Sequence, residues 1–119
     1  MSLVFVYGTL KRGCSNHHLL AGQAFLGEAR TPQGFALFSL GSHPGIVEIP
    51  ADSGSVTGEV WSVDEECLEQ LDALEGTEEG IYRRGAVPLL DPFAGRGVEA
   101  YFYLESLEGR KRLGEAWTE

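Results

Sequence analysis

A single carboxyl group, that of Glu75, stands out in the acid-rich segment between residues 64 and 79. On a helix through this segment, at about 100° per residue, Glu75 lies close to the apolar side chains of Leu68 and Leu71. The other acids of the helix point the other way: Glu65, Glu66, Glu69 and Asp72. Burial, the negative end of the helix dipole and the neighbouring acids would each raise the pKa of Glu75 above its usual value of about 4.3. A carboxyl with a raised pKa can act as a general acid or base near neutral pH.

Two other arrangements of this carboxyl remain open. If the helix frays after Leu74, the Glu75 side chain turns into solvent and keeps an ordinary pKa. If Arg83 or Arg84 pairs with Glu75, the ion pair lowers the pKa of the carboxyl instead.

A second chemically suggestive feature is Gly8, which directly follows the apolar run from Leu3 to Tyr7. A glycine after a buried strand lets the backbone turn sharply and leaves N–H groups free to bind a carboxylate or an oxyanion. Gly8 and Gly13 are also spaced as in a phosphate-binding P-loop. That motif requires Lys immediately after its second glycine, where this chain has Cys14, so we expect no nucleotide site.

The loop that follows carries Cys14, His17 and His18. A thiol beside an imidazole could be a nucleophile with its base, which gives Cys14-dependent acyl transfer as one hypothesis. With His43 the same residues could bind zinc, but their spacing matches no zinc motif, and we expect no metal. A polar, solvent-facing loop explains these residues equally well. Cys14 and Cys67 lie in no Cys-x-x-Cys spacing, which predicts two reduced thiols.

Short strands and one long helix must position these residues. Asp64 is a good N-cap and Gly76 a good C-terminal stop, so the helix is expected between them. Its apolar stripe consists of Cys67, Leu68, Leu71 and Leu74. Strands are expected at 3–7, 56–62, 82–90 and 98–104, with a short helix before Gly22 and short strands and turns over 24–49. This pattern favours an α+β fold, and the absence of a G-x-G-x-x-G motif argues against a dinucleotide-binding fold.

Composition narrows the functional classes. The chain has 119 residues, 43% of them apolar, which suits one domain. Nine basic residues against 18 acidic ones give a net charge of −9. Because nucleic acids are bound mainly through Lys and Arg, we expect no nucleic-acid partner. The sequence contains no apolar run of membrane-spanning length and no signal-peptide pattern at its start, so we expect no membrane association and a cytoplasmic protein.

Two blocks of the sequence resemble the γ-glutamylcyclotransferase-like superfamily, specifically its small γ-glutamylamine cyclotransferase and AIG2-like branch. The first block is VFVYGTLKRG at residues 4–13, followed by Asn16-His17. The second block consists of GEVWSVD at 58–64, LDALEG at 71–76 and YRR at 82–84. The tetrapeptide YGTL is a weak signal by itself, whereas the order and spacing of both blocks over residues 4–84 make the resemblance specific.

The resemblance implies a small mixed β-barrel of about five to seven strands with one main helix and one or two short helices, forming a single domain over residues 1–119. It also implies an intramolecular aminolysis, in which the α-amine of a small γ-glutamyl substrate attacks its own γ-carbonyl. The products are 5-oxoproline and an amine or amino acid. Glu75 would be the general acid/base, and the substrate would be bound by Tyr7, Gly8, Thr9, Leu10 and Tyr82.

No cofactor is expected, because the substrate supplies its own nucleophile. The acidic turn Glu78-Glu79-Gly80 argues against substrates that carry an extra carboxylate. The alternative is a non-catalytic domain that binds a small metabolite or a protein in the same pocket. The leaving amine and the oligomeric state are left open by the sequence.

Overall fold

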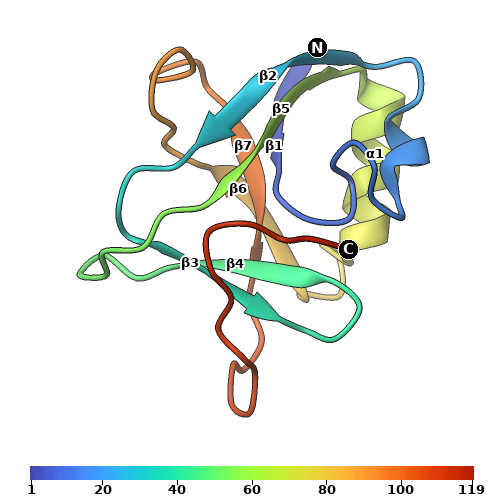
Figure 1. Ribbon diagram of the computed structural model, residues 1–119. Coiled ribbons are helices and arrows are strands. Elements are labelled where there is room, and N and C mark those ends of the chain that lie inside the picture. Colours follow the sequence, from blue (N-terminus) through green and yellow to red (C-terminus); the bar gives the residue numbers. More distant parts are fainter.

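The computed structural model describes all 119 residues and consists of a curled, mixed seven-stranded sheet with one long helix beside it (Figure 1). The strands are β1 (Ser2–Val6), β2 (Ala24–Arg30), β3 (Phe35–Ser39), β4 (Pro44–Glu48), β5 (Thr57–Val63), β6 (Tyr82–Ala86) and β7 (Glu99–Tyr103). The helices are the 3-10 helix η1 (His17–Leu20) and the α-helix α1 (Glu65–Glu75). The α+β class and the number of strands agree with the prediction.

The strand order is β2-β5-β1-β7-β4-β3, with β6 paired to β7 off this path. Strand β7 joins the two halves of the sheet, because it runs parallel to β1 through the pair Val4 and Glu99 and parallel to β4 through Ile46 and Phe102. The end strands β2 and β3 do not pair with each other, so the sheet is barrel-like without being closed. None of the helices is both long enough and apolar enough to cross a membrane.

Strand β1 is buried on both faces, as its unbroken apolar run predicts. Phe5 packs in a cluster of 13 buried residues on one face of the sheet, while Val4 and Val6 pack in a cluster of 10 on the other. The second cluster includes Cys67 and Leu71 of α1. The opening strand therefore lies where both cores meet, and its C-terminal end is held firmly.

Helix α1 begins and ends where its capping signals predict. The Asp64 side chain accepts a hydrogen bond from the backbone N–H of Cys67 at 2.8 Å, and Gly76 closes the helix in the left-handed conformation at a φ of 67°. The predicted apolar stripe is wrong at Leu74, which is 46% exposed. The last turn of α1 extends past the core to the rim of a cavity, and Leu74 lies on that rim.

Candidate active site

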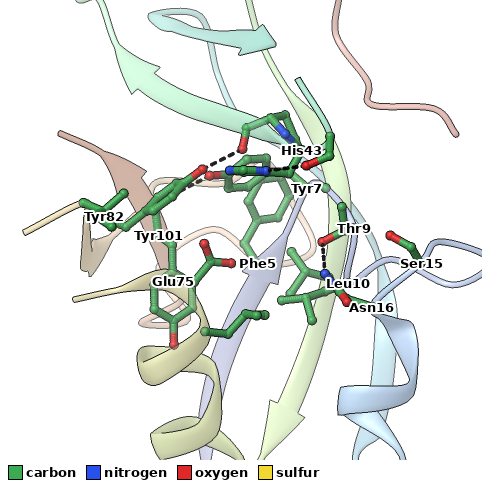
Figure 2. A pocket seen from close by; sticks show the side chains of 16 residues that line it. Phe5, Tyr7, Thr9, Leu10, Ser15, Asn16, His43, Glu75, Tyr82 and Tyr101 are labelled. Carbon is green, nitrogen blue, oxygen red and sulfur yellow. Dashed lines mark hydrogen bonds between the residues drawn. The ribbon is translucent and has the colours of Figure 1, made fainter. Parts of the chain in front are cut away.

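A cavity of about 380 Å³ lies where the end of β1, the end of α1 and the turn before β4 meet (Figure 2). All the residues that the sequence and the resemblance single out for the site line this one cavity: Tyr7, Gly8, Thr9, Leu10, Glu75 and Tyr82. The cavity is lined by 16 residues, and among the ten that were not named as site residues are Asn16, Pro44 and Tyr101. Asn16-His17 stood in the recognised motif, but nothing local indicated that Pro44 and Tyr101 would approach the same space.

The Glu75 side chain extends from the last turn of α1 into the cavity (Figure 2). Burial raises the pKa of this carboxyl to about 7. Of the three causes that the sequence suggested, burial is the one that dominates the raised pKa of Glu75. Neither alternative arrangement occurs, because α1 remains helical through Glu75, Arg83 lies over the Phe102 ring and Arg84 pairs with Asp72.

Tyr7 and Tyr82 flank Glu75, yet their hydroxyl groups are bound to backbone groups elsewhere. The Tyr7 hydroxyl donates to the backbone oxygen of Tyr101 at 2.6 Å and accepts from the N–H of Ile46 at 3.2 Å. The Tyr82 hydroxyl donates to the backbone oxygen of Pro44 at 2.9 Å. Burial also raises the pKa of both phenols, so both stay neutral near neutral pH. These rings shape the cavity without neutralising the carboxyl.

The third tyrosine of the cavity, Tyr101, donates its hydroxyl to the Asp72 carboxylate at 2.7 Å. Asp72 was expected on the solvated face of α1, and that expectation is wrong: the carboxylate is partly buried between Tyr101 and Arg84. No hydrogen bond and no ion pair reaches the Glu75 carboxyl itself. Glu75 is therefore a largely but not fully buried carboxyl without a compensating partner, a condition that favours a side chain acting as a base at neutral pH.

The opposite wall is the loop that starts at Gly8. Its carbonyls are occupied, since Gly8 O accepts from the N–H of Lys11 at 3.1 Å and Thr9 O accepts from the N–H of Asn16 at 2.9 Å. The Asn16 amide also donates to the Thr9 hydroxyl at 3.0 Å. The N–H groups of Gly8, Thr9 and Leu10 donate no hydrogen bond within the protein. A hydrogen-bonded loop thus carries free backbone donors at the cavity wall, as the sequence suggested.

The need for glycine at position 8 has a different physical reason from the predicted one. The φ angle of Gly8 is not positive, so the backbone conformation there does not require glycine. Instead, a Cβ at this position would lie 2.7 Å from Cγ and 2.8 Å from Cδ of Pro44. Gly8 is required because β1 and the start of β4 approach closely at the cavity wall.

The residues of the alternative chemistries do not come together. Cys14 is not part of the cavity wall, and burial raises the pKa of its thiol, which disfavours the thiolate. The His17 ring nitrogen Nδ1 lies 3.0 Å from the Leu10 carbonyl rather than beside the thiol. Both cysteines are free, as predicted. No group of three or more His, Cys, Asp or Glu side chains is arranged to hold a metal ion.

The raised pKa of Glu75 predicts a stability cost that grows with pH. The folded protein holds this proton with a pKa of about 7, against an ordinary value of 4.5 in the unfolded chain. The contribution of this proton to the free energy of unfolding is thus fully present below pH 4.5 and is lost as the pH rises through about 7. The loss amounts to about 3 kcal/mol in all. Glu75→Gln should match the native protein near pH 4.5 and exceed it in stability at pH 8. Urea unfolding at both pH values measures this, and equal stabilities at pH 8 would contradict the burial of the charge.

Comparisons with known proteins agree with this fold. The family model described as gamma-glutamyl cyclotransferase, AIG2-like, matches residues 4–119, so the chain belongs to that family. A relative from Vibrio cholerae is 44% identical over 104 residues, which cover 87% of this chain and 84% of the relative. Gamma-glutamylaminecyclotransferase from Mus musculus is 38% identical over 116 residues, covering 87% and 77%. A crystal structure of an AIG2-like protein from Mus musculus superimposes with a TM-score of 0.72 at 34% identity, covering 89% and 78%. The resemblance found in the sequence is thereby confirmed.

Proposed function

We propose that this protein is a γ-glutamyl cyclotransferase that releases 5-oxoproline from a small γ-glutamyl compound, with Glu75 as general acid/base. The observation that carries the proposal is the presence, in one cavity, of a largely buried carboxyl without a partner and a loop of free backbone N–H groups. Family membership supports the reaction class and does not favour the non-catalytic alternative.

In the proposed reaction the substrate supplies its own nucleophile. The α-amine attacks the γ-carbonyl carbon, the new C–N bond closes a five-membered ring, and the bond from that carbon to the leaving nitrogen breaks. Glu75 takes one proton from the α-ammonium and passes it to the leaving nitrogen, and then takes a second proton from the attacking nitrogen, which keeps one hydrogen as the lactam N–H. The released amine accepts this second proton and departs as an ammonium, so protons balance without water or a cofactor. The N–H groups of Gly8, Thr9 and Leu10 hold the α-carboxylate or the oxyanion that develops on the γ-carbonyl. Holding the substrate in its ring-closing conformation supplies the rest of the rate enhancement.

The charged groups in and around the cavity indicate which substrates it can bind. No Lys or Arg side chain lines it, so backbone donors must bind a substrate carboxylate there. The cavity is also lined by the apolar residues Leu74 and Ile81, and the acids Glu78 and Glu79 are exposed in the adjoining turn. These features favour γ-glutamyl amines or small dipeptides over substrates with an extra carboxylate. A nucleic-acid partner and a membrane partner stay unexpected, and a cytoplasmic location stays a prediction from the sequence.

A panel of γ-glutamyl compounds tests the proposal. The purified protein is incubated with γ-glutamyl amines, γ-glutamyl dipeptides and glutathione, and 5-oxoproline is measured by chromatography. We expect release from at least one amine or neutral dipeptide and less from glutathione. If no compound of the panel is turned over, the reaction is wrong and the non-catalytic alternative gains support.

The pH dependence of the reaction gives a second test. Glu75 must carry its charge to accept the first proton, and burial sets the pKa of this group to about 7. We therefore expect kcat/KM to rise with pH through an apparent pKa near 7 and to fall about tenfold for each pH unit below it. Rates measured from pH 5 to pH 9 check this, with the substrate's own α-amine titrating at higher pH. An acid limb with an apparent pKa near 4.5 would show that the working base is an ordinary exposed carboxyl.

A further inference from the structure

Asp72 lies one helical turn before Glu75 and belongs to a polar network behind the cavity wall. Its Oδ1 atom accepts the hydroxyl of Tyr101 at 2.7 Å and lies 3.6 Å from Nε of Arg84. The Arg84 guanidinium also lies 3.8 Å from Oε1 of Glu99. The network thus connects α1 with β6 and β7. Its only link to the cavity is the ring of Tyr101.

The direction of the Tyr101 hydroxyl is the informative detail. The ring lies beside the Glu75 carboxyl, while its oxygen points along α1 toward Asp72 and away from that carboxyl (Figure 2). A phenol hydroxyl is a good donor to a carboxylate, and such a hydrogen bond would stabilise the charged form of Glu75 and weaken it as a base. Asp72 provides a competing acceptor for this hydroxyl.

The other tyrosines that face Glu75 need no side chain to hold their hydroxyls away from it. The Tyr7 and Tyr82 hydroxyls are bound by backbone carbonyls, which no change of charge can remove. His43 lines the cavity from the turn before β4. Tyr101 is the one neighbouring phenol whose hydroxyl is held by a side chain.

We propose that Asp72 is a positioning residue for the reaction: held by Arg84, it keeps the Tyr101 hydroxyl turned away from Glu75 and fixes the Tyr101 ring as a wall of the cavity. This inference rests on the proposed function for its effect on rate. The orientation itself has a separate readout, which is the pKa of Glu75 in the protein without substrate.

The test compares Asp72→Ala, Tyr101→Phe and the double variant with a matched control, Glu69→Ala. Glu69 is an exposed acid on the same helix and has no polar contact. Carbon-13 NMR of glutamate carboxyl groups in the full chain follows the titration of Glu75. We expect Asp72→Ala to lower the pKa of Glu75 by about one unit, because the Tyr101 hydroxyl becomes free to bond to it. Glu69→Ala and Tyr101→Phe should leave that pKa unchanged within about 0.3.

The double variant distinguishes positioning from a simple effect of charge. Without the Tyr101 hydroxyl, no phenol can turn toward Glu75. Adding Tyr101→Phe to Asp72→Ala should therefore reverse more than half of the decrease in the pKa of Glu75. If the pKa stays low in the double variant, Asp72 acts through its charge and the positioning role is wrong. An unchanged pKa in Asp72→Ala would overturn the proposal as well. Asp72→Asn, which keeps the size and an acceptor oxygen, should show a smaller shift and serves as the test should Asp72→Ala fail to fold.

Kinetics complete the experiment. We expect Asp72→Ala to lower kcat about tenfold with KM changed less than about twofold, and its acid limb to move to lower pH with the pKa of Glu75. A native kcat alongside a shifted NMR pKa would overturn the catalytic relevance of the positioning. If the native protein itself releases no 5-oxoproline, the proposed function fails, while the NMR titrations still decide whether Asp72 orients Tyr101.

Discussion

Replacing Glu75 with Gln should lower kcat/KM for the γ-glutamyl substrate by roughly 10²–10⁴-fold, the range that general acid–base catalysis supplies. The amide has nearly the same size and cannot exchange a proton, so the ring-closing nitrogen keeps its proton and the leaving nitrogen receives none. No hydrogen bond or ion pair reaches the carboxyl, and Glu75 is the only carboxyl that lines the cavity, so no second carboxyl can replace it there. The loss should appear mainly in kcat, since the substitution leaves untouched the N–H groups of the Gly8 loop that we propose bind the substrate.

The variant must remain folded for this result to count, and the structure predicts that it does. Removing a buried charge relieves a cost, so Glu75→Gln should unfold no more easily than the native protein at any pH from 5 to 8. Glu78→Gln is the matched control, because it removes an exposed carboxyl from the adjoining turn. Release of 5-oxoproline is measured for all three proteins at pH 8. A Glu75→Gln protein with native activity would remove Glu75 from the mechanism even if the reaction itself is correct.

The parts of the fold that the sequence predicts well are those governed by local chemistry. Asp64 and Gly76 set the two ends of α1 because an N-cap carboxylate and a left-handed glycine act on the backbone groups next to them. Helical spacing places Glu75 toward the interior as long as the helix continues to Gly76, as it does. The strand at 82–90 was predicted too long, since β6 ends at Ala86, shortly before Pro88, which has no N–H to donate to a sheet.

The parts of the site that the sequence did not predict depend on contacts between distant segments. Tyr101 donates a hydrogen bond to Asp72, which lies 29 positions away in the sequence. Nothing near either residue in the sequence indicates that this helix acid would be partly shielded from solvent. Leu74 follows the apolar spacing yet lies on the cavity rim, because the helix extends beyond the core that the spacing implies. Local patterns thus indicated that Glu75 faces inward, whereas the groups that surround its carboxyl could be identified only from the tertiary structure.

The second large effect is expected at Gly8, where Val should lower both stability and activity. A Cβ there would lie 2.7 Å from Cγ of Pro44, closer than real Cβ contacts allow, and a proline ring cannot rotate away. Either β1 or the start of β4 must shift. Because Pro44 O also binds the Tyr82 hydroxyl and the Gly8 loop carries the free N–H groups, such a shift deforms both walls of the cavity.

We expect Gly8→Ala to cost about 1–3 kcal/mol of unfolding free energy and Gly8→Val more, since overpacking forces backbone movement and valine adds two further methyl groups. Activity should fall at least about 100-fold, because a misplacement of about 1 Å at a positioning loop has that effect. Gly114→Ala is the control, as a Cβ at that position meets no atom within 4 Å and its φ is not positive.

A double-mutant cycle assigns the loss to the contact with Pro44. Removing the ring atoms with Pro44→Ala makes room for a Cβ at position 8, so the stability cost of Gly8→Ala should be smaller in that background, by about 0.5–3 kcal/mol of coupling. Thermal melts measure the stability and 5-oxoproline release measures the activity. If the two substitutions add independently, the close approach of β1 and β4 does not constrain Gly8. The loop must then require glycine because a ligand comes close to its backbone, and Gly8→Ala would lose substrate affinity at nearly native stability.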